Sequence, residues 1–365
     1  MILSLLDGLP GRKLPPNTHG NQAYPMRMVL CYPVESRHID QIRRAVPDYE
    51  VIDAGQEFVA EELLDADLYC GHAKVPVDWD AVVRQGRLRW VQSSAAGMDH
   101  CLVPSVIDSD IVVTSASGVL SDQVAEHTVA LITAWTRSLP VFFRQQQTKE
   151  FVRRPTRDLT RSTVGIVGLG AVGRRLAEVL RPFRTRILAT DAFPLDRPAW
   201  VDELWPAERL DDLLVECDIV VLCAPLNDST RGMIGADELG RMKGGSLLVN
   251  AARGALVATE ALVDAILSGH LAGAVMDVTD PEPLPPGHRL WGTPNVIITP
   301  HVAGQARWRI DRMTQLLCEN LRRWRSGEPL INRLADKSLG FPTRGGPYPL
   351  WSDLAEGIIN KPVRL

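Results

Sequence analysis

The chain has 365 residues, of which 45% are hydrophobic and 23% charged, and its 40 Lys and Arg against 44 Asp and Glu give a formal net charge of -4. This length predicts about two domains, each able to bury a core, and the composition excludes a wholly disordered, collagen-like or coiled-coil chain. Because no global positive charge attracts nucleic acid or an anionic membrane, we expect a small molecule or another protein as the partner.

The two ends of the chain differ from its middle in composition and periodicity. Residues 1–25 carry Gly and Pro without periodicity and lack the basic start and long apolar core of a secretory signal, so we interpret them as an N-terminal arm. Residues 333–365 are again rich in Gly and Pro and are interpreted as a C-terminal tail. No apolar run reaches the roughly 18 residues of a membrane span. The six cysteines form no C-x-x-C pair, so we expect reduced thiols, no metal and a cytoplasmic protein.

From residue 26 to about 120, short β-rich runs alternate with helical stretches. Strands are predicted over 29–32, 50–53, 68–70, 89–93 and 111–114, with helices such as 36–46 and 78–84 between them. This alternation predicts a parallel sheet covered by helices. A long apolar-periodic helix follows over 121–137, ending before Pro140, and the segment after it is interpreted as a loop.

A second α/β series begins at Thr163. Strands are predicted over 163–167, 186–190, 218–223, 246–250, 273–276 and 296–298, which indicates a doubly wound sheet of about six strands. The helix expected over 305–326 carries one apolar side and is expected to return the chain to the first domain.

The glycine motif Gly168-Leu-Gly170-Ala-Val-Gly173 follows the first strand of this series and opens a helix. In a dinucleotide fingerprint the three glycines serve a tight turn, the approach of backbone to a pyrophosphate, and helix-to-strand packing. The N–H groups of Ala171 and Val172 would then hold the phosphates at the helix N-terminus.

The next strand ends at Asp191, about twenty residues further on, where a carboxylate can accept hydrogen bonds from the adenosine ribose and repel a 2′-phosphate. This favours NAD over NADP. Arg186 and Arg197 lie nearby in the sequence and leave use of NADP open.

Four further segments stand at the ends of later strands, where open α/β sheets bind ligands. They are 221–226 with Thr230 after it, 250–254, 277–283 and 299–304. They bring an Arg, a Glu and a His to ends of three strands, so these side chains can meet at one edge of the sheet.

With these motifs in order, the chain resembles the D-2-hydroxyacid dehydrogenases, the D-isomer-specific NAD-dependent oxidoreductases. The resemblance runs from about residue 29 to 333 and rests on the glycine fingerprint, Asn250-Ala-Ala-Arg253-Gly254, the segment 277–283 and Thr299-Pro-His301. It implies two doubly wound α/β domains, with a Rossmann NAD-binding domain (121–304) inserted in a flavodoxin-like substrate domain (26–120 with 305–332). It also implies a homodimer formed through the 121–137 helix and the loop after it, with Trp135, Phe142 and Phe143 as candidate interface residues.

The resemblance also implies roles for single residues. Arg253 would bind the substrate carboxylate and keto oxygen, His301 would be the acid/base with Glu282 as its partner, and Asp277 would contact the nicotinamide carboxamide. The implied cofactor-binding residues are Gly168, Gly170, Ala171, Val172, Gly173, Asp191, Cys223, Ala224, Pro225, Thr230, Ala251, Ala252, Arg253, Asp277, His301 and Gly304. The implied substrate-binding residues are Ala95, Ala96, Gly97, Arg253 and His301.

These residue types suit hydride transfer to a keto acid. An imidazolium can protonate the developing alkoxide, a neighbouring carboxylate fixes its tautomer, and a guanidinium fork can hold a carboxylate while it polarises a carbonyl. The expected function is therefore reduction of a small 2-keto acid with NADH, with glyoxylate or hydroxypyruvate as first candidates. His72 and Lys74, after a strand of the first domain, could face the far end of the substrate or solvent.

The sequence is also compatible with other functions. Phosphoglycerate dehydrogenase is one alternative, and a dinucleotide-sensing corepressor of the same fold is another, since such sensors retain a similar Arg/Glu/His set. Formate dehydrogenases of this family carry Gln at the position of Glu282, which disfavours that activity. Cys223 departs from the family, which often has His there. Ala125-Glu126-His127, at the start of the long helix, also resembles a family segment, and we expect it to pack rather than to catalyse.

Overall fold

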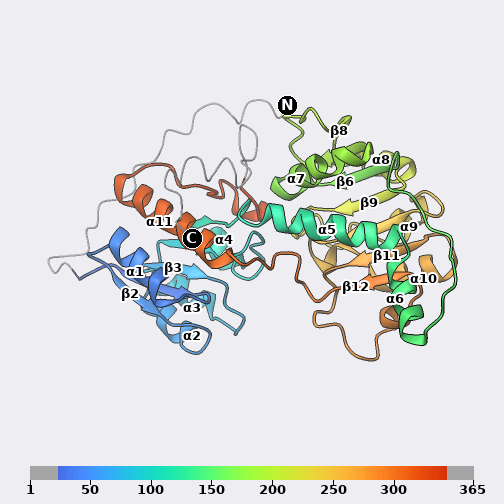
Figure 1. Cartoon of the computed structure of the whole chain (residues 1–365). Coiled ribbons are helices and arrows are strands. Elements are labelled where there is room, and N and C mark those ends of the chain that lie inside the picture. The colour runs from blue at the N-terminus through green and yellow to red at the C-terminus, as the bar shows by residue number, and fades with distance from the viewer. Residues whose placement is uncertain (1–23, 343–365) are drawn as a thin grey trace. The chain divides into compact units, whose positions relative to one another are not determined.

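The computed structural model describes residues 24–342, and these divide into two compact units. Unit 1 comprises 24–119 and 307–342, and unit 2 comprises 120–306 (Figure 1). Most of the predicted N-terminal arm and the predicted tail from residue 343 onward lie outside the described residues. Within the described part of the chain, no helix is long and apolar enough to cross a membrane. All six cysteines are free thiols, as expected.

Unit 1 is built on a parallel sheet of five strands in the order β2-β1-β3-β4-β5. The strands are β1 (Arg27–Cys31), β2 (Glu50–Asp53), β3 (Leu68–Gly71), β4 (Trp90–Ser93) and β5 (Val112–Thr114). The helices are α1 (Ser36–Ala45), α2 (Val59–Glu62), α3 (Trp79–Gln85), α4 (Pro104–Asp108) and α11 (Arg309–Ser326).

The two faces of this sheet bury alternate residues, because successive side chains of a strand point to opposite sides. Val91 of β4 belongs to the core that α2, α3 and α4 close. Its neighbour Trp90 stacks instead on Trp324 of α11, with ring centroids 5.3 Å apart. α11 also packs against α1, so the helix predicted near the end of the chain does return to the first unit, and it covers the second face.

Unit 2 has a parallel sheet of seven strands in the order β12-β11-β10-β9-β6-β7-β8. The strands are β6 (Thr163–Val167), β7 (Arg186–Asp191), β8 (Glu203–Pro206), β9 (Ile219–Leu222), β10 (Leu247–Asn250), β11 (Gly273–Met276) and β12 (Val296–Ile298). The longer helices are α5 (Ser121–Thr136), α6 (Leu139–Thr148), α7 (Ala171–Leu180), α8 (Leu210–Glu216), α9 (Ala236–Arg241) and α10 (Thr259–Leu267).

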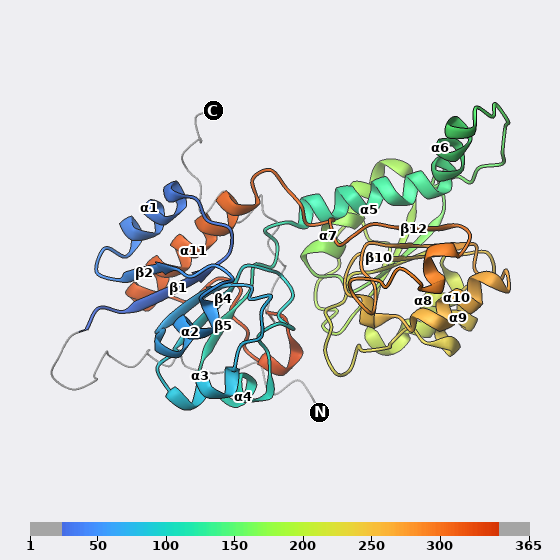
Figure 2. The same ribbon diagram turned by 90° about the horizontal axis from the view of Figure 1, so that it is seen from below.

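Helices cover both faces of this sheet (Figure 2). In β9, Val220 and Leu222 pack with side chains of α8, α9 and α10, whereas Ile219 and Val221 pack with those of α5 and α7. Burial on both sides explains why these strands read as continuous apolar runs. The two predicted doubly wound sheets are confirmed.

Two elements of unit 2 differ from the prediction. The sheet has a seventh strand, β8, a four-residue edge strand that ends in Pro206 and carries no apolar run of its own. The segment after Pro140 is the helix α6 rather than a loop. Pro140 lies in the first turn of that helix, where its missing N–H costs no hydrogen bond, so it starts α6 instead of ending a helical region.

Candidate active site

The polar segments picked out in the second half of the sequence lie along one edge of the unit 2 sheet. All pairings in this sheet are parallel, so the loops after β6, β7, β9, β10, β11 and β12 share its carboxyl edge. Ligands of open α/β sheets bind at this edge.

The glycine turn between β6 and α7 has the geometry of a phosphate cradle. Gly168 adopts φ 96°, and a Cβ at Gly173 would lie 2.2 Å from the carbonyl oxygen of Gly168, so the chain itself requires glycine at both positions. A Cβ on Gly170 would meet nothing within 4 Å. Glycine at that position instead leaves space beside the α7 N-terminus, where backbone N–H groups favour an anionic ligand.

Asp191, the last residue of β7, lies beside this turn. Its Oδ2 accepts a hydrogen bond from the N–H of Leu169 at 2.7 Å, and its Oδ1 accepts from the N–H of Phe193 at 2.8 Å. Each carboxylate oxygen has a second lone pair for a ribose hydroxyl. The glycine turn and Asp191 therefore fit the phosphate and ribose groups of a dinucleotide.

The arginines near this carboxylate are engaged with the protein. Arg186 stands at the opposite end of β7 and pairs with Glu203 and Glu216, so it cannot reach a ligand at the carboxyl edge. Arg197 donates to the carbonyl oxygens of Val201 and Asp202.

Arg174, which the sequence analysis did not single out, links the glycine turn to the loop after β7. It donates to the carbonyl oxygen of Leu169 at 3.0 Å and to that of Asp196 at 2.7 Å. The sequence signal that could have identified Arg174 is its position directly after Gly173, the third glycine of the motif.

The loop after β9 is held by its own polar groups. The hydroxyl of Thr230 donates to the carbonyl oxygen of Pro225 at 2.7 Å and accepts from the N–H of Asn227 at 2.9 Å. Burial raises the pKa of the Cys223 thiol to about 12, so this side chain is a neutral thiol near physiological pH. Cys223 can thus line a ligand site there without acting as a nucleophile.

The loop after β10 is fixed by buried Asn250. Its side chain donates to the carbonyl oxygen of Arg253 at 2.8 Å and accepts from the N–H of Ala252 at 3.1 Å, which forms the turn that carries Arg253. At Gly254 this loop meets the loop after β11, because a Cβ there would lie 1.9 Å from the carbonyl oxygen of Thr279. Only glycine permits that approach, so Gly254 brings the segment of Arg253 against the segment that leads to Glu282.

Asp277, at the end of β11, fastens the loop that carries His301. The carboxylate is only 1% exposed and accepts from the Thr299 hydroxyl at 2.6 Å and from the N–H groups of Val302 and Ala303 at 3.0 and 2.9 Å. In the structure, Asp277 therefore positions the loop that carries His301.

His301 and Glu282 form a hydrogen-bonded pair. Nδ1 of His301 lies 2.7 Å from Oε1 of Glu282, and because a carboxylate only accepts, the ring donates this bond. The bond leaves Nε2 of the ring to face a ligand. Both side chains are nearly half exposed, so the pair is open to solvent-borne molecules.

In unit 1, the residues Ala95, Ala96 and Gly97, which the resemblance implies to bind substrate, lie on the loop after β4. The N–H of Ala95 donates to the hydroxyl of Ser93 at 3.0 Å. Within the described residues, no hydrogen bond occupies the N–H groups of Ala96 and Gly97.

His127 of α5 contacts the loop that carries His301. Its Nε2 lies 3.2 Å from the Thr299 hydroxyl and 3.4 Å from Oδ1 of Asp277. This agrees with the expectation that the segment around His127 packs, and it shows that the packing supports the candidate site. Gly304 ends the same loop, where a Cβ would make an ordinary contact of 3.6 Å with Leu120.

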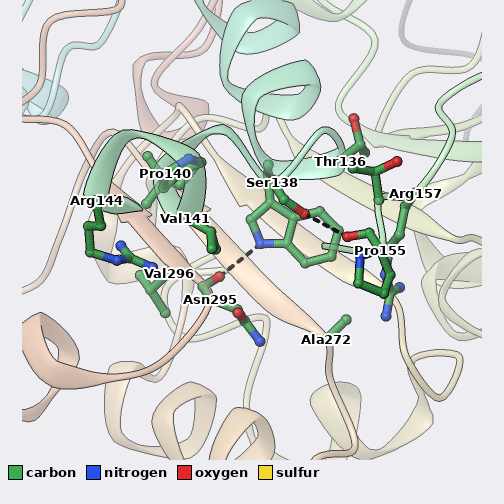
Figure 3. Close-up of a pocket in the computed structure, with 13 residues that line it drawn as sticks. Thr136, Ser138, Pro140, Val141, Arg144, Pro155, Arg157, Ala272, Asn295 and Val296 are labelled. Atoms are coloured by element: carbon green, nitrogen blue, oxygen red, sulfur yellow. Dashed lines mark hydrogen bonds between the residues drawn. The ribbon is translucent and has the colours of Figure 1, made fainter. Parts of the chain in front are cut away.

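A cavity of about 190 Å³ lies elsewhere in unit 2, between the ends of α5 and α6 and the amino end of β12 (Figure 3). The Trp135 indole donates to the carbonyl oxygen of Asn295 at 2.8 Å in its wall, and Arg144 and Arg157 supply its charges. Because β12 begins here, the cavity is remote from the carboxyl edge and is not the dinucleotide site.

Comparison with known proteins agrees with this arrangement. The model of the D-isomer specific 2-hydroxyacid dehydrogenase NAD-binding domain matches residues 129–303. A glyoxylate reductase of Aeropyrum pernix is 36% identical over 304 residues, which cover 78% of this chain and 90% of the relative. The chain belongs to the D-isomer specific 2-hydroxyacid dehydrogenase family.

Other members of the family extend the comparison. An (S)-sulfolactate dehydrogenase of Chromohalobacter salexigens is 34% identical over 250 residues, covering 68% of this chain and 81% of the relative. A family member from Xanthobacter autotrophicus Py2, solved with NADPH and MES, superposes with a TM-score of 0.73 at 28% identity, covering 87% of this chain and all of that one. This 2-hydroxyacid dehydrogenase is thus an NAD-binding oxidoreductase that acts on the CH–OH group of a hydroxy acid.

Proposed function

We propose that this dehydrogenase interconverts a short 2-keto acid and its D-2-hydroxy acid, the class that includes glyoxylate and hydroxypyruvate. The observation that carries the proposal is the 2.7 Å hydrogen bond between His301 and Glu282 at the ligand-binding edge of a sheet with a dinucleotide fingerprint. Relatives named glyoxylate reductase and glycerate dehydrogenase support short substrates, and one named D-3-phosphoglycerate dehydrogenase supports the alternative with a phosphate.

His301 is the proposed acid/base. Bound NADH supplies a hydride to the keto carbon. The imidazolium of His301 donates its Nε2 proton to the keto oxygen as negative charge develops there, and in the reverse direction the neutral ring takes the hydroxyl proton. Glu282 holds Nδ1 protonated and so keeps the proton-transferring nitrogen directed toward the ligand.

Arg253 is the proposed ligand of the substrate carboxylate. A guanidinium can bind the substrate carboxylate and polarise the adjacent carbonyl, which a lysine ammonium does less well. In unit 1, Ala95, Ala96 and Gly97 are the proposed substrate-binding residues, with the N–H groups of Ala96 and Gly97 as backbone donors. The contacts of Asn250 and Gly254 support the proposal, because they hold the segment of Arg253 in one conformation.

Asp191 is the proposed cause of a preference for NADH over NADPH, because its carboxylate would repel a 2′-phosphate. The engagement of Arg186 and Arg197 with the protein supports this preference, since neither is available in this conformation to neutralise a phosphate. A homodimer and a cytoplasmic location are also proposed. Exposed apolar side chains on and after α6, among them Phe143 and Phe151, support the dimer.

The test is His301→Ala. We expect turnover of the best 2-keto acid to fall by about 100-fold or more, because the proton donor is lost, while the Kd of NADH, measured by fluorescence, stays within a few-fold of wild type. Loss of NADH binding together with activity would contradict the role given to His301. Wild-type protein that binds NADH and reduces no 2-keto acid would refute the proposed function itself.

A further inference from the structure

His127 connects the helix α5 to the loop that carries the proposed acid/base. Its Nε2 lies 3.2 Å from the hydroxyl oxygen of Thr299 and 3.4 Å from Oδ1 of Asp277. Thr299 precedes His301 by two residues, and all four of these residues belong to unit 2. The imidazole of His127 therefore contacts the loop of His301 from a different element than β11, after which Asp277 stands.

The direction of these hydrogen bonds follows from the chemistry of the three groups. The Thr299 hydroxyl lies 2.6 Å from Oδ1 of Asp277, and because a carboxylate only accepts, the hydroxyl donates its proton there. The Thr299 oxygen then acts as an acceptor toward His127, so Nε2 of that ring carries a proton and donates it. The result is a chain of hydrogen bonds from His127 through Thr299 to the buried carboxylate of Asp277.

The backbone of the loop is fixed largely by Asp277. Its carbonyl oxygen accepts from the N–H of His301 at 2.7 Å, and its carboxylate accepts from the N–H groups of Val302 and Ala303. His127 adds a contact from a residue that is 172 positions from Thr299 in the sequence. Because His301 has φ 52°, a conformation uncommon outside glycine, the direction of its ring depends on the contacts that hold this backbone.

We propose that His127 is a positioning residue for the proposed reaction: by donating to Thr299, it holds the loop in the conformation in which His301 meets the substrate. The inference rests on the proposed function, because it concerns the orientation of the proposed acid/base. His127 acts through Thr299 and Asp277 and transfers no proton itself. A displacement of about 1 Å at a reacting group can cost about 100-fold in rate, so one lost supporting hydrogen bond is expected to lower kcat.

The first experiment measures kcat for the best 2-keto acid at saturating NADH. His127→Leu removes the donor and is expected to lower kcat by about 10-fold while the Kd of NADH changes less. His127→Gln keeps an N–H donor and is expected to stay within about 3-fold of wild type. Thr133→Val is the matched control, because the hydroxyl that it removes donates to carbonyl oxygens within α5, and it should leave kcat unchanged.

Two results of this experiment would overturn the inference. One is an unchanged kcat in His127→Leu, which would leave the proposed function standing. The other is an equal loss in His127→Leu and His127→Gln, because the hydrogen bond would then not be the cause.

A double-mutant cycle tests whether His127 acts through Thr299. Thr299→Val removes the hydroxyl that lies between His127 and Asp277. His127→Leu is expected to lower kcat much less in the Thr299→Val protein than in wild type, because the interaction is already absent there. Losses that multiply fully would contradict the chain of hydrogen bonds.

Hydrogen–deuterium exchange read by mass spectrometry separates this inference from the proposed function. His127→Leu is expected to raise deuterium uptake in peptides that span residues 299–304, and His127→Gln is not, whether or not a 2-keto acid is reduced. If wild-type protein reduces none of these acids, the proposed function fails, and the exchange decides whether His127 holds the loop. Unchanged uptake in His127→Leu, with the fold verified by circular dichroism, would show that the loop does not depend on His127.

Discussion

At the scale of single residues, the candidate site depends on polar side chains that fix the conformation of its loops. These side chains are distinct from the proposed catalytic residues. Asp277 is almost fully buried and accepts three hydrogen bonds from the loop of His301, and Asn250 makes two within the turn of Arg253. Buried polar groups are expensive unless satisfied, so such networks favour one loop conformation over its alternatives. Because of them, His301 is held in place although its own backbone has φ 52°, a conformation uncommon outside glycine.

Asp191 provides a residue-scale prediction. Asp191→Ala removes the carboxylate that would repel a 2′-phosphate, so the ratio of kcat/KM for NADH over that for NADPH is expected to fall by about 10-fold. The substitution also removes the hydrogen bond to the N–H of Leu169, so Asp191→Asn, which retains an acceptor without the charge, separates the two effects. An unchanged ratio in both variants would place cofactor discrimination outside the end of β7.

At the scale of elements, the parallel order of the strands brings distant segments to one edge, and glycines set how closely the loops approach. The loops after β10 and β11 meet at Gly254, where the carbonyl oxygen of Thr279 occupies the place of a side chain. Arg253 and Glu282 are separated by a strand and a helix in the sequence, yet this approach brings their two loops into contact.

Gly254→Ala should therefore damage both stability and catalysis. The Cβ would force the two loops apart, which we expect to cost about 2 kcal/mol in the free energy of unfolding and to lower kcat more than it raises the Kd of NADH. Gly240→Ala is the matched control, since a Cβ in that turn of α9 meets nothing within 4 Å and alanine favours a helix by about 0.5–1 kcal/mol. Urea unfolding of both variants measures the difference. Equal stability of the two would contradict the close approach.

At the scale of the whole molecule, α6 presents apolar surface that a single copy of the chain leaves in water. Phe143 is 58% exposed, and Leu139, Phe151 and Val152 add further exposed apolar groups on the same helix and the segment after it. Several exposed apolar side chains within one short segment are typical of an interaction surface.

We expect the protein to elute in size-exclusion chromatography with light scattering at twice the chain mass of 40.3 kDa. Phe143→Glu should shift it toward the mass of one chain, because a charge would be buried in the contact. Val215→Glu is the control, since Val215 is similarly exposed at 55% but lies on α8. If wild-type protein has the mass of one chain, or if Val215→Glu dissociates it as strongly as Phe143→Glu does, the contact proposed at α6 is wrong.

The sequence by itself determined the fold class and the dinucleotide fingerprint, and its resemblance to the family implied the candidate acid/base pair. Apolar runs of strand length alternating with helices specify parallel sheets, and the glycine spacing specifies a turn, because both are local properties of the backbone. Local sequence signals gave wrong predictions where the secondary structure of a segment depended on its position relative to other segments. β8 is a strand because it pairs with β7, and α6 is a helix in spite of Pro140 because that proline occupies the first turn.

Only the tertiary structure decided which polar groups are available in each of the two units. It engaged the N–H of Ala95 with Ser93, tied Arg186 into ion pairs at the far end of its strand, joined His127 and Asp277 to the loop of His301, and stacked His72 on His100. Apart from the bond between Ala95 and Ser93, which are neighbours in the sequence, each of these contacts joins residues that are far apart along the chain. The physical reason is that a hydrogen bond or ring contact depends on positions within a few ångströms, which strand order and packing set and which residue identity alone does not.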